Sequence, residues 1–181
     1  MILIVEGVDR VGKTTLVNKI TENCHIKPFI DSYLKFSYFD LKCNQENIVK
    51  GDRNCIIANT EKINSLVNFY EQFYDKITDV IFDRLHLSEF VYGMCDREYT
   101  SFEAFKILDE KLAKLNALII YIEPKDLEWS SNKHGSNLEH HYNTFEYILN
   151  ETKCEVIRCN FDTLDEVVSK IKERVTNNGS C

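Results

Sequence analysis

The residues whose types and spacing can do chemistry stand near the start of the chain, at Gly7, Gly12, Lys13 and Thr14. They form the pattern G-x-x-x-x-G-K-T, a phosphate-binding loop whose glycines let backbone N–H groups turn inward. In such a loop the lysine reaches the β- and γ-phosphates of a nucleoside triphosphate, and the threonine hydroxyl ligates Mg²⁺. The nucleotide-binding set is therefore predicted to be Gly7, Val8, Asp9, Arg10, Val11, Gly12, Lys13, Thr14 and Thr15.

The flanks of this loop are the elements that must position it. Residues 2–5 are a short apolar run typical of a fully buried strand. After the loop, apolar residues recur at helical spacing, at Leu16, Val17, Ile20 and Cys24. A strand, a loop and a helix in this order make a phosphate cradle, because the helix N-terminus adds partial positive charge. This context disfavours a chance match to the motif.

The rest of the chain alternates strand and helix patterns. Further strands are predicted around 33–38 and at 80–82, 117–122 and 154–158, and helices at 61–77, 86–94, 101–115, 138–149 and 164–175. This alternation predicts a parallel five-stranded sheet flanked by helices, an α/β fold. We expect one domain over residues 1–181, with a short lid at about 125–138 and a frayed tail at about 176–181.

A second group with chemical potential follows the strand at 80–82. Asp83 and Arg84 come where that strand ends, and α/β sheets bind ligands at the carboxyl ends of their strands. Asp83 can hold a Mg²⁺-bound water or orient the acceptor, and Arg84 can clamp phosphates with two hydrogen bonds. The predicted metal site is therefore Thr14 with Asp83, and the predicted catalytic residues include Lys13, Asp83 and Arg84.

The charge and cysteine content of the sequence exclude several classes of function. The 181 residues carry a net charge of −7 without a basic cluster, which argues against a nucleic-acid surface. None of the seven cysteines forms a C-x-x-C pair, and neither a signal peptide nor a membrane-spanning run is evident. We therefore expect reduced cysteines and a cytoplasmic location. The excess of lysine over arginine and the many asparagines hint at an AT-rich genome; a viral source would place the protein in the host cytoplasm.

Two segments resemble the thymidylate kinases. The stretch from Val5 to Thr15, Val-Glu-Gly-Val-Asp-Arg-Val-Gly-Lys-Thr-Thr, is similar to the opening of that family. The segment from Phe82 to Gly93 resembles its Asp-Arg-(Tyr/His)-x-x-Ser…Tyr-x-Gly motif, with Leu85 in place of the ring residue. The resemblance implies a Rossmann-like P-loop kinase fold, transfer of the ATP γ-phosphate to a nucleoside monophosphate, Mg²⁺ as cofactor, and a homodimer. The expected reaction is dTMP to dTDP.

The resemblance also implies roles for single residues. One branch of the family carries a basic residue in the phosphate loop and lacks an arginine in the lid. Arg10 lies in the loop and residues 125–150 contain no arginine, so this chain is similar to that branch. Arg10 would then stabilise charge on the transferring phosphoryl group. The implied acceptor-binding residues are Asp9, facing the sugar hydroxyl, together with Arg84 and Tyr92. Asn59 and Lys62 are added to this set as the nearest polar candidates by count, because the family's base-reading arginine is absent here.

Two alternatives remain open. A deoxynucleoside kinase phosphorylates a neutral hydroxyl and needs a general base, normally a glutamate just after the second strand. No glutamate lies between Ile26 and Gln45, which favours a phosphate acceptor. A non-catalytic nucleotide-binding module is the other alternative, but this chain carries more charged groups than binding alone requires. The long helix at 61–77 lacks the arginine with which thymidylate kinases read their base, so the acceptor base stays undetermined.

Overall fold

Strand β1 lies at the centre of a parallel sheet, as its uninterrupted apolar sequence predicts. The computed structural model describes residues 1–24, 27–28, 80–96, 102–125 and 138–178. Within these ranges the sheet has five parallel strands in the order β2-β3-β1-β4-β5. The strands are β1 (Ile2–Glu6), β2 (Lys27–Pro28), β3 (Val80–Asp83), β4 (Leu118–Ile122) and β5 (Glu155–Cys159). The predicted α/β fold with a five-stranded parallel sheet is confirmed.

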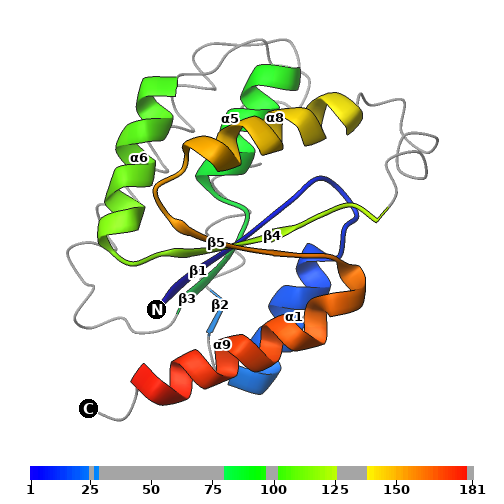
Figure 1. Ribbon diagram of the computed structural model, residues 1–181, viewed down its shortest axis with the longest axis vertical. Coiled ribbons are helices and arrows are strands. Elements are labelled where there is room, and N and C mark those ends of the chain that lie inside the picture. The colour runs from blue at the N-terminus through cyan, green and yellow to red at the C-terminus, as the bar shows by residue number, and fades with distance from the viewer. Residues whose placement is uncertain (25–26, 29–79, 97–101, 126–137, 179–181) are drawn as a thin grey trace, which may run out of the picture.

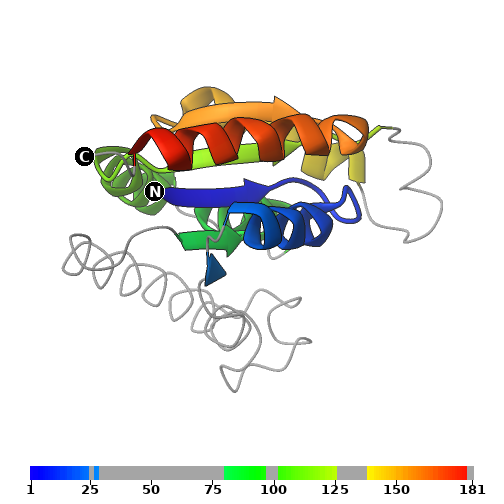
Figure 2. The same ribbon diagram turned by 90° about the horizontal axis from the view of Figure 1, so that it is seen from below.

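Helices cover both faces of this sheet (Figure 1). On one face α1 packs against α9, and on the other α5 packs against both α6 and α8 (Figures 1 and 2). The described helices are α1 (Lys13–Cys24), α5 (His86–Asp96), α6 (Phe102–Lys114), α8 (Leu138–Glu151), the short 3-10 helix η1 (Phe161–Thr163) and α9 (Leu164–Asn178). None of the helices in these described ranges is long and apolar enough to cross a membrane.

The central strands are buried on both faces. Every residue of β1 and of β4 is buried, and Ile4 of β1 lies between Phe82 of β3 and Ile119 of β4. This two-sided burial is why these strands read as continuous apolar runs rather than as alternating patterns. The carboxyl ends of β1 and β3 meet at one edge, because Val5 pairs in register with Asp83. The two groups that the sequence singles out therefore lie side by side.

The predicted elements agree with the described ones except at the second strand. Its predicted position at 33–38 lies outside the described residues, as do the helix at 61–77 and most of the lid at 125–138. Among the described residues, β2 lies at Lys27–Pro28, where Lys27 pairs with Val80. Two residues including a proline carry no periodic signal, so the sequence could not locate this strand. At the other end, α9 continues to Asn178, so residues 176–178 are helical.

Candidate active site

The phosphate-binding loop connects β1 to α1, and its two glycines cannot be replaced. Gly7 has a φ of +143°, and a Cβ atom there would lie 2.6 Å from the backbone oxygen of Ile122 in β4. Gly12 has a φ of +99°, and its Cβ would lie 2.7 Å from the ring of Phe161. Both positions therefore need a residue without a side chain. At these two glycines the loop is closely approached by β4 and by η1, which follows β5.

Lys13 is the first residue of α1 and is buried, with only 6% of its surface exposed. Its Nζ atom donates a hydrogen bond of 2.5 Å to the backbone oxygen of Val8, so the side chain curls back over the loop. Burial lowers the pKa of Lys13 to about 8, and the positive charge of Arg84 lowers it too, against the opposing effect of nearby carboxylates. The ammonium group therefore lies inside the loop, where the phosphates of a nucleotide would bind.

This depressed pKa predicts a pH dependence of ATP binding. ATP binding needs the charged form of Lys13, so above pH 8 the unliganded protein must take up a proton when it binds. We expect the affinity for ATP to be constant below pH 8 and to fall by up to about tenfold per pH unit above it. Calorimetric titration from pH 7 to 9.5 measures this.

The matched control for this pH dependence is Lys13→Arg, because a guanidinium stays charged throughout the range. The variant should bind ATP with an affinity that is flat from pH 7 to 9.5, even if its absolute affinity is lower. An alkaline fall of equal steepness in both proteins would show that another group causes it.

Thr14 and Asp83 face each other across the edge of the sheet. The Thr14 hydroxyl donates to Asp83 Oδ2 over 3.3 Å, although the two residues are 69 positions apart in the sequence. Oxygen ligands are those that Mg²⁺ prefers, and two neighbouring ligands of an octahedral Mg²⁺ lie about 2.9 Å apart. The donor set and its spacing therefore fit the predicted magnesium site.

Asp9, Arg84 and Tyr92 form a second group at the same edge. Arg84 is ion-paired with Asp9 Oδ1, its guanidinium lies 5.0 Å from the centre of the Tyr92 ring, and the Tyr92 hydroxyl donates to Asp9 over 3.4 Å. Burial alone would raise the pKa of Asp9, but Arg84 and Lys13 lower it below its usual value. Burial raises the pKa of Tyr92 to about 12. The structure thus brings together three of the five residues predicted to bind the acceptor.

Arg10 occupies the exposed tip of the phosphate loop. Its φ of +65° is in the left-handed region, which is unusual for a residue with a side chain. Its side chain makes no hydrogen bond or ion pair with any residue that the structure describes.

The remaining predicted acceptor residues, Asn59 and Lys62, lie outside the described residues. Two residues that sequence reasoning did not single out, Glu6 and Ser88, lie fully buried between the loop and the turn at Arg84. A charged residue at the end of a strand resembles an ordinary surface position, and only the pairing of β1 with β3 reveals that it is buried. The serine does belong to the segment that resembles the kinase motif.

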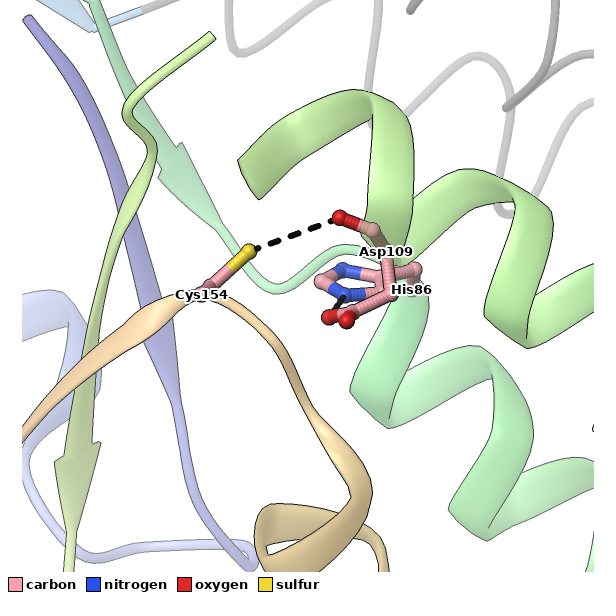
Figure 3. Close-up of side chains that lie close together, drawn as sticks. All are labelled: His86, Asp109 and Cys154. Carbon is pink, nitrogen blue, oxygen red and sulfur yellow. Dashed lines mark hydrogen bonds and ion pairs between the residues drawn. The ribbon is translucent and has the colours of Figure 1, made fainter. Parts of the chain in front are cut away.

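A buried polar cluster joins α5, α6 and the residue just before β5 (Figure 3). The side-chain ligand atoms of His86, Asp109 and Cys154 lie within 4.8 Å of one another. His86 Nε2 lies 3.0 Å from Asp109 Oδ1, and the Cys154 thiol donates to the backbone oxygen of Asp109 over 3.7 Å.

The hydrogen-bond partners of Asp109 indicate that this cluster is a structural network and not a metal site. Asp109 also accepts hydrogen bonds from the Thr152 hydroxyl and, over 2.6 Å, from the Lys153 backbone N–H. Burial would raise the pKa of Asp109, but its hydrogen bonds hold it below the usual value. Burial raises the pKa of the Cys154 thiol to about 12, so it is not a thiolate at neutral pH. Both carboxylate oxygens of Asp109 already have hydrogen-bond partners. The cluster therefore joins α5, α6 and the segment before β5.

Neither a family model nor a curated protein matches this sequence. Among solved structures, the YorR protein of Bacillus subtilis, in complex with phosphorylated GDP, has a TM-score of 0.66 at 15% identity, covering 100% of this chain and 99% of that one. Deoxyadenosine kinase from M. mycoides, with the products dCMP and dCDP bound, has a TM-score of 0.56 at 14% identity, covering 98% and 100%.

A third similar structure is the thymidylate kinase of Candida albicans, with a TM-score of 0.53 at 17% identity, covering 98% of this chain and 92% of that one. This chain shares the fold of these three proteins, two of which are kinases. At such low identities the likeness concerns the fold and leaves the substrate open. It confirms the kinase fold that the two sequence motifs imply.

Proposed function

We propose that this protein is an ATP-dependent nucleoside-monophosphate kinase that transfers the γ-phosphate of ATP to a deoxynucleoside 5′-monophosphate, with dTMP as the leading acceptor. The observation that carries the proposal is the meeting of two groups at one sheet edge. Lys13, Thr14 and Asp83 are suited to the triphosphate and its metal, and Asp9, Arg84 and Tyr92 are suited to a second, phosphate-bearing substrate. A nucleotide-binding module without catalysis would not need the second group.

The charge and position of each residue at this edge of the sheet suggest its role in phosphoryl transfer. Lys13 draws electron density from the β- and γ-phosphates, and Arg10 at the loop tip compensates the charge that develops on the transferring group. Mg²⁺, held through Thr14 and Asp83, would neutralise phosphate oxygens when bound. Arg84 binds the acceptor phosphate, while Asp9 orients Arg84 and accepts a hydrogen bond from the acceptor sugar. An acceptor phosphate is already an anion, so no general base is required.

Deoxynucleoside kinase activity is the second candidate, since deoxyadenosine kinase from M. mycoides shares the fold over its whole length. It would require a carboxylate to deprotonate a sugar hydroxyl. Asp9 is an exposed carboxylate at the ligand-binding edge of the sheet, but its ion pair with Arg84 and its lowered pKa make it a weak base. The segment after β2 contributes no glutamate up to Gln45.

Location in a cytoplasm and assembly into a homodimer are also part of the proposal for the monophosphate kinase.

An assay of ADP release separates these candidates. ATP and Mg²⁺ are supplied with each common nucleoside monophosphate and with each free nucleoside in turn. We expect turnover with deoxynucleoside monophosphates and most with dTMP, because Arg84 provides a site for an acceptor phosphate. Efficient phosphorylation of thymidine without phosphorylation of dTMP would make the protein a nucleoside kinase. If the protein binds ATP but turns over no acceptor, it is a nucleotide-binding module without catalytic activity.

A further inference from the structure

Glu6 ends the central strand β1 and is completely buried, although it carries a carboxylate. Among the described residues, the hydrogen-bond partners of its two oxygens all lie in the turn that follows β3 and in the first turn of α5. Oε1 accepts hydrogen bonds from the backbone N–H of Leu85, over 2.9 Å, and of Ser88, over 3.4 Å. Oε2 accepts from the hydroxyl of Ser88. A single side chain therefore joins the start of the phosphate loop to the turn that carries Asp83 and Arg84.

These hydrogen bonds replace a missing helix cap. Helix α5 begins at His86, so Leu85 is its N-cap residue, and the apolar side chain of Leu85 has no oxygen to offer. The N–H of Ser88 is the third in the helix, one that an N-cap side chain normally satisfies. Glu6 supplies that acceptor from a neighbouring strand. The beginning of α5 is thus fixed to β1 rather than capped by its own sequence.

The turn that Glu6 holds has an unfavourable backbone conformation. Arg84 has a φ of +72°, in the left-handed region that a residue with a Cβ atom adopts only when its surroundings enforce it. The Arg84 N–H donates to the backbone oxygen of Val5 over 2.9 Å, and the next N–H, of Leu85, donates to Glu6. Two consecutive residues of β1 therefore clamp two consecutive amides of the turn.

We propose that Glu6 is a positioning residue for phosphoryl transfer, because it holds the turn that aims Arg84 and Asp83 into the site. This inference rests on the proposed function. The clamp directs the Arg84 guanidinium toward Asp9 and Tyr92, and keeps the Asp83 carboxylate 3.3 Å from the Thr14 hydroxyl. Glu6 itself is completely buried and acts through the turn that it holds.

The proposal is tested first with Glu6→Ala and Glu6→Gln. Without the acceptor, the turn at Arg84 relaxes, and a displacement of about 1 Å costs on the order of 10²-fold in turnover. We expect Glu6→Ala to lower kcat by that order while the KM for ATP changes only a few-fold. Glu6→Gln should stay within a few-fold of the original protein. Its amide oxygen still accepts from the Leu85 N–H, and the Ser88 hydroxyl can rotate to accept from its amide nitrogen.

A matched pair of milder variants covers the case in which Glu6→Ala does not fold. Ser88→Ala removes a buried hydroxyl that donates to Glu6, and Thr152→Val removes one that donates to Asp109. Asp109 anchors the same helix through His86 but does not touch the turn at Arg84. Both variants should lose similar thermal stability, and only Ser88→Ala should also lose kcat. Equal kcat in the two variants would overturn the proposal, as would a Glu6→Gln protein as slow as Glu6→Ala.

Hydrogen exchange separates this inference from the proposed function. The amide protons of Leu85 and Ser88, measured by NMR without substrates, should exchange faster in Glu6→Ala or Ser88→Ala than in Thr152→Val. Unchanged exchange would show that Glu6 does not hold the turn. If the original protein transfers no phosphate to any acceptor, the proposed function is wrong. Faster exchange would then still establish the clamp and would limit its role to orienting Arg84.

Discussion

Replacing Lys13 with alanine is expected to lower phosphoryl transfer by on the order of 10³-fold without unfolding the protein. The ammonium group is the cation held inside the phosphate-binding loop, and its loss leaves the β- and γ-phosphates uncompensated. The fold should survive, because burial already disfavours the charged lysine, as its lowered pKa shows. The measurement is kcat with saturating ATP and dTMP, together with the thermal unfolding midpoint.

Lys19→Ala is the matched control for this experiment. Lys19 is a lysine of the same helix, and its ammonium group pairs with Asp165 of α9 at the protein surface rather than with the loop. Such a surface pair contributes at most about 1 kcal/mol to stability, and its removal should leave kcat unchanged. Unchanged transfer in Lys13→Ala would exclude this loop as the site of reaction.

Replacing Arg10 with glycine is expected to lower kcat by on the order of 10³-fold, or about 4 kcal/mol, with only a few-fold change in ATP affinity. The reason is that a charge acting on the transferring group matters most in the transition state. Stability should not fall, because glycine adopts the φ of +65° found at this position without strain. Steady-state kinetics at saturating ATP and acceptor, with a separate measurement of ATP binding, tests this.

Lys133→Ala is the comparison for Arg10→Gly, since Lys133 is a cation of the predicted lid, which contains no arginine. If the loop supplies the charge, this variant should lose far less turnover than the Arg10 variant. A larger loss in the Lys133 variant would mean that the lid carries the charge and that the resemblance to the loop-arginine branch is misleading. Both proteins must first be shown to unfold at temperatures close to that of the original.

The sequence was most informative where one physical constraint acts over a few consecutive residues. The strands at 2–5 and 80–82 are buried on both faces, and their apolar runs are sufficient to identify them. Asp83 and Arg84 could be placed at the ligand-binding edge because parallel strands end together. The motif G-x-x-x-x-G-K-T specified the loop between β1 and α1.

What the sequence could not supply are relations between distant residues. The ion pair of Asp9 with Arg84 joins residues 75 positions apart, and the Glu6 clamp joins residues 79 positions apart. Nothing local marks Glu6 as buried, since its environment exists only once β3 lies beside β1. The same holds for Asp109, which lies on the inner face of an otherwise ordinary amphipathic helix. Strand β2, at Lys27–Pro28, owes its place to pairing with β3 rather than to its own residues.

The central position of β1 has a consequence for how the chain acquires its structure. This strand precedes both of its neighbours in the sequence, and they begin only at Val80 and Leu118. Pairings between segments so far apart in sequence form slowly, because a long loop must close before they gain any stability. The Gly7 turn, which rests against Ile122, cannot be supported until β4 has been synthesised. Nucleotide binding should therefore appear late in folding, only after β4 has joined the sheet.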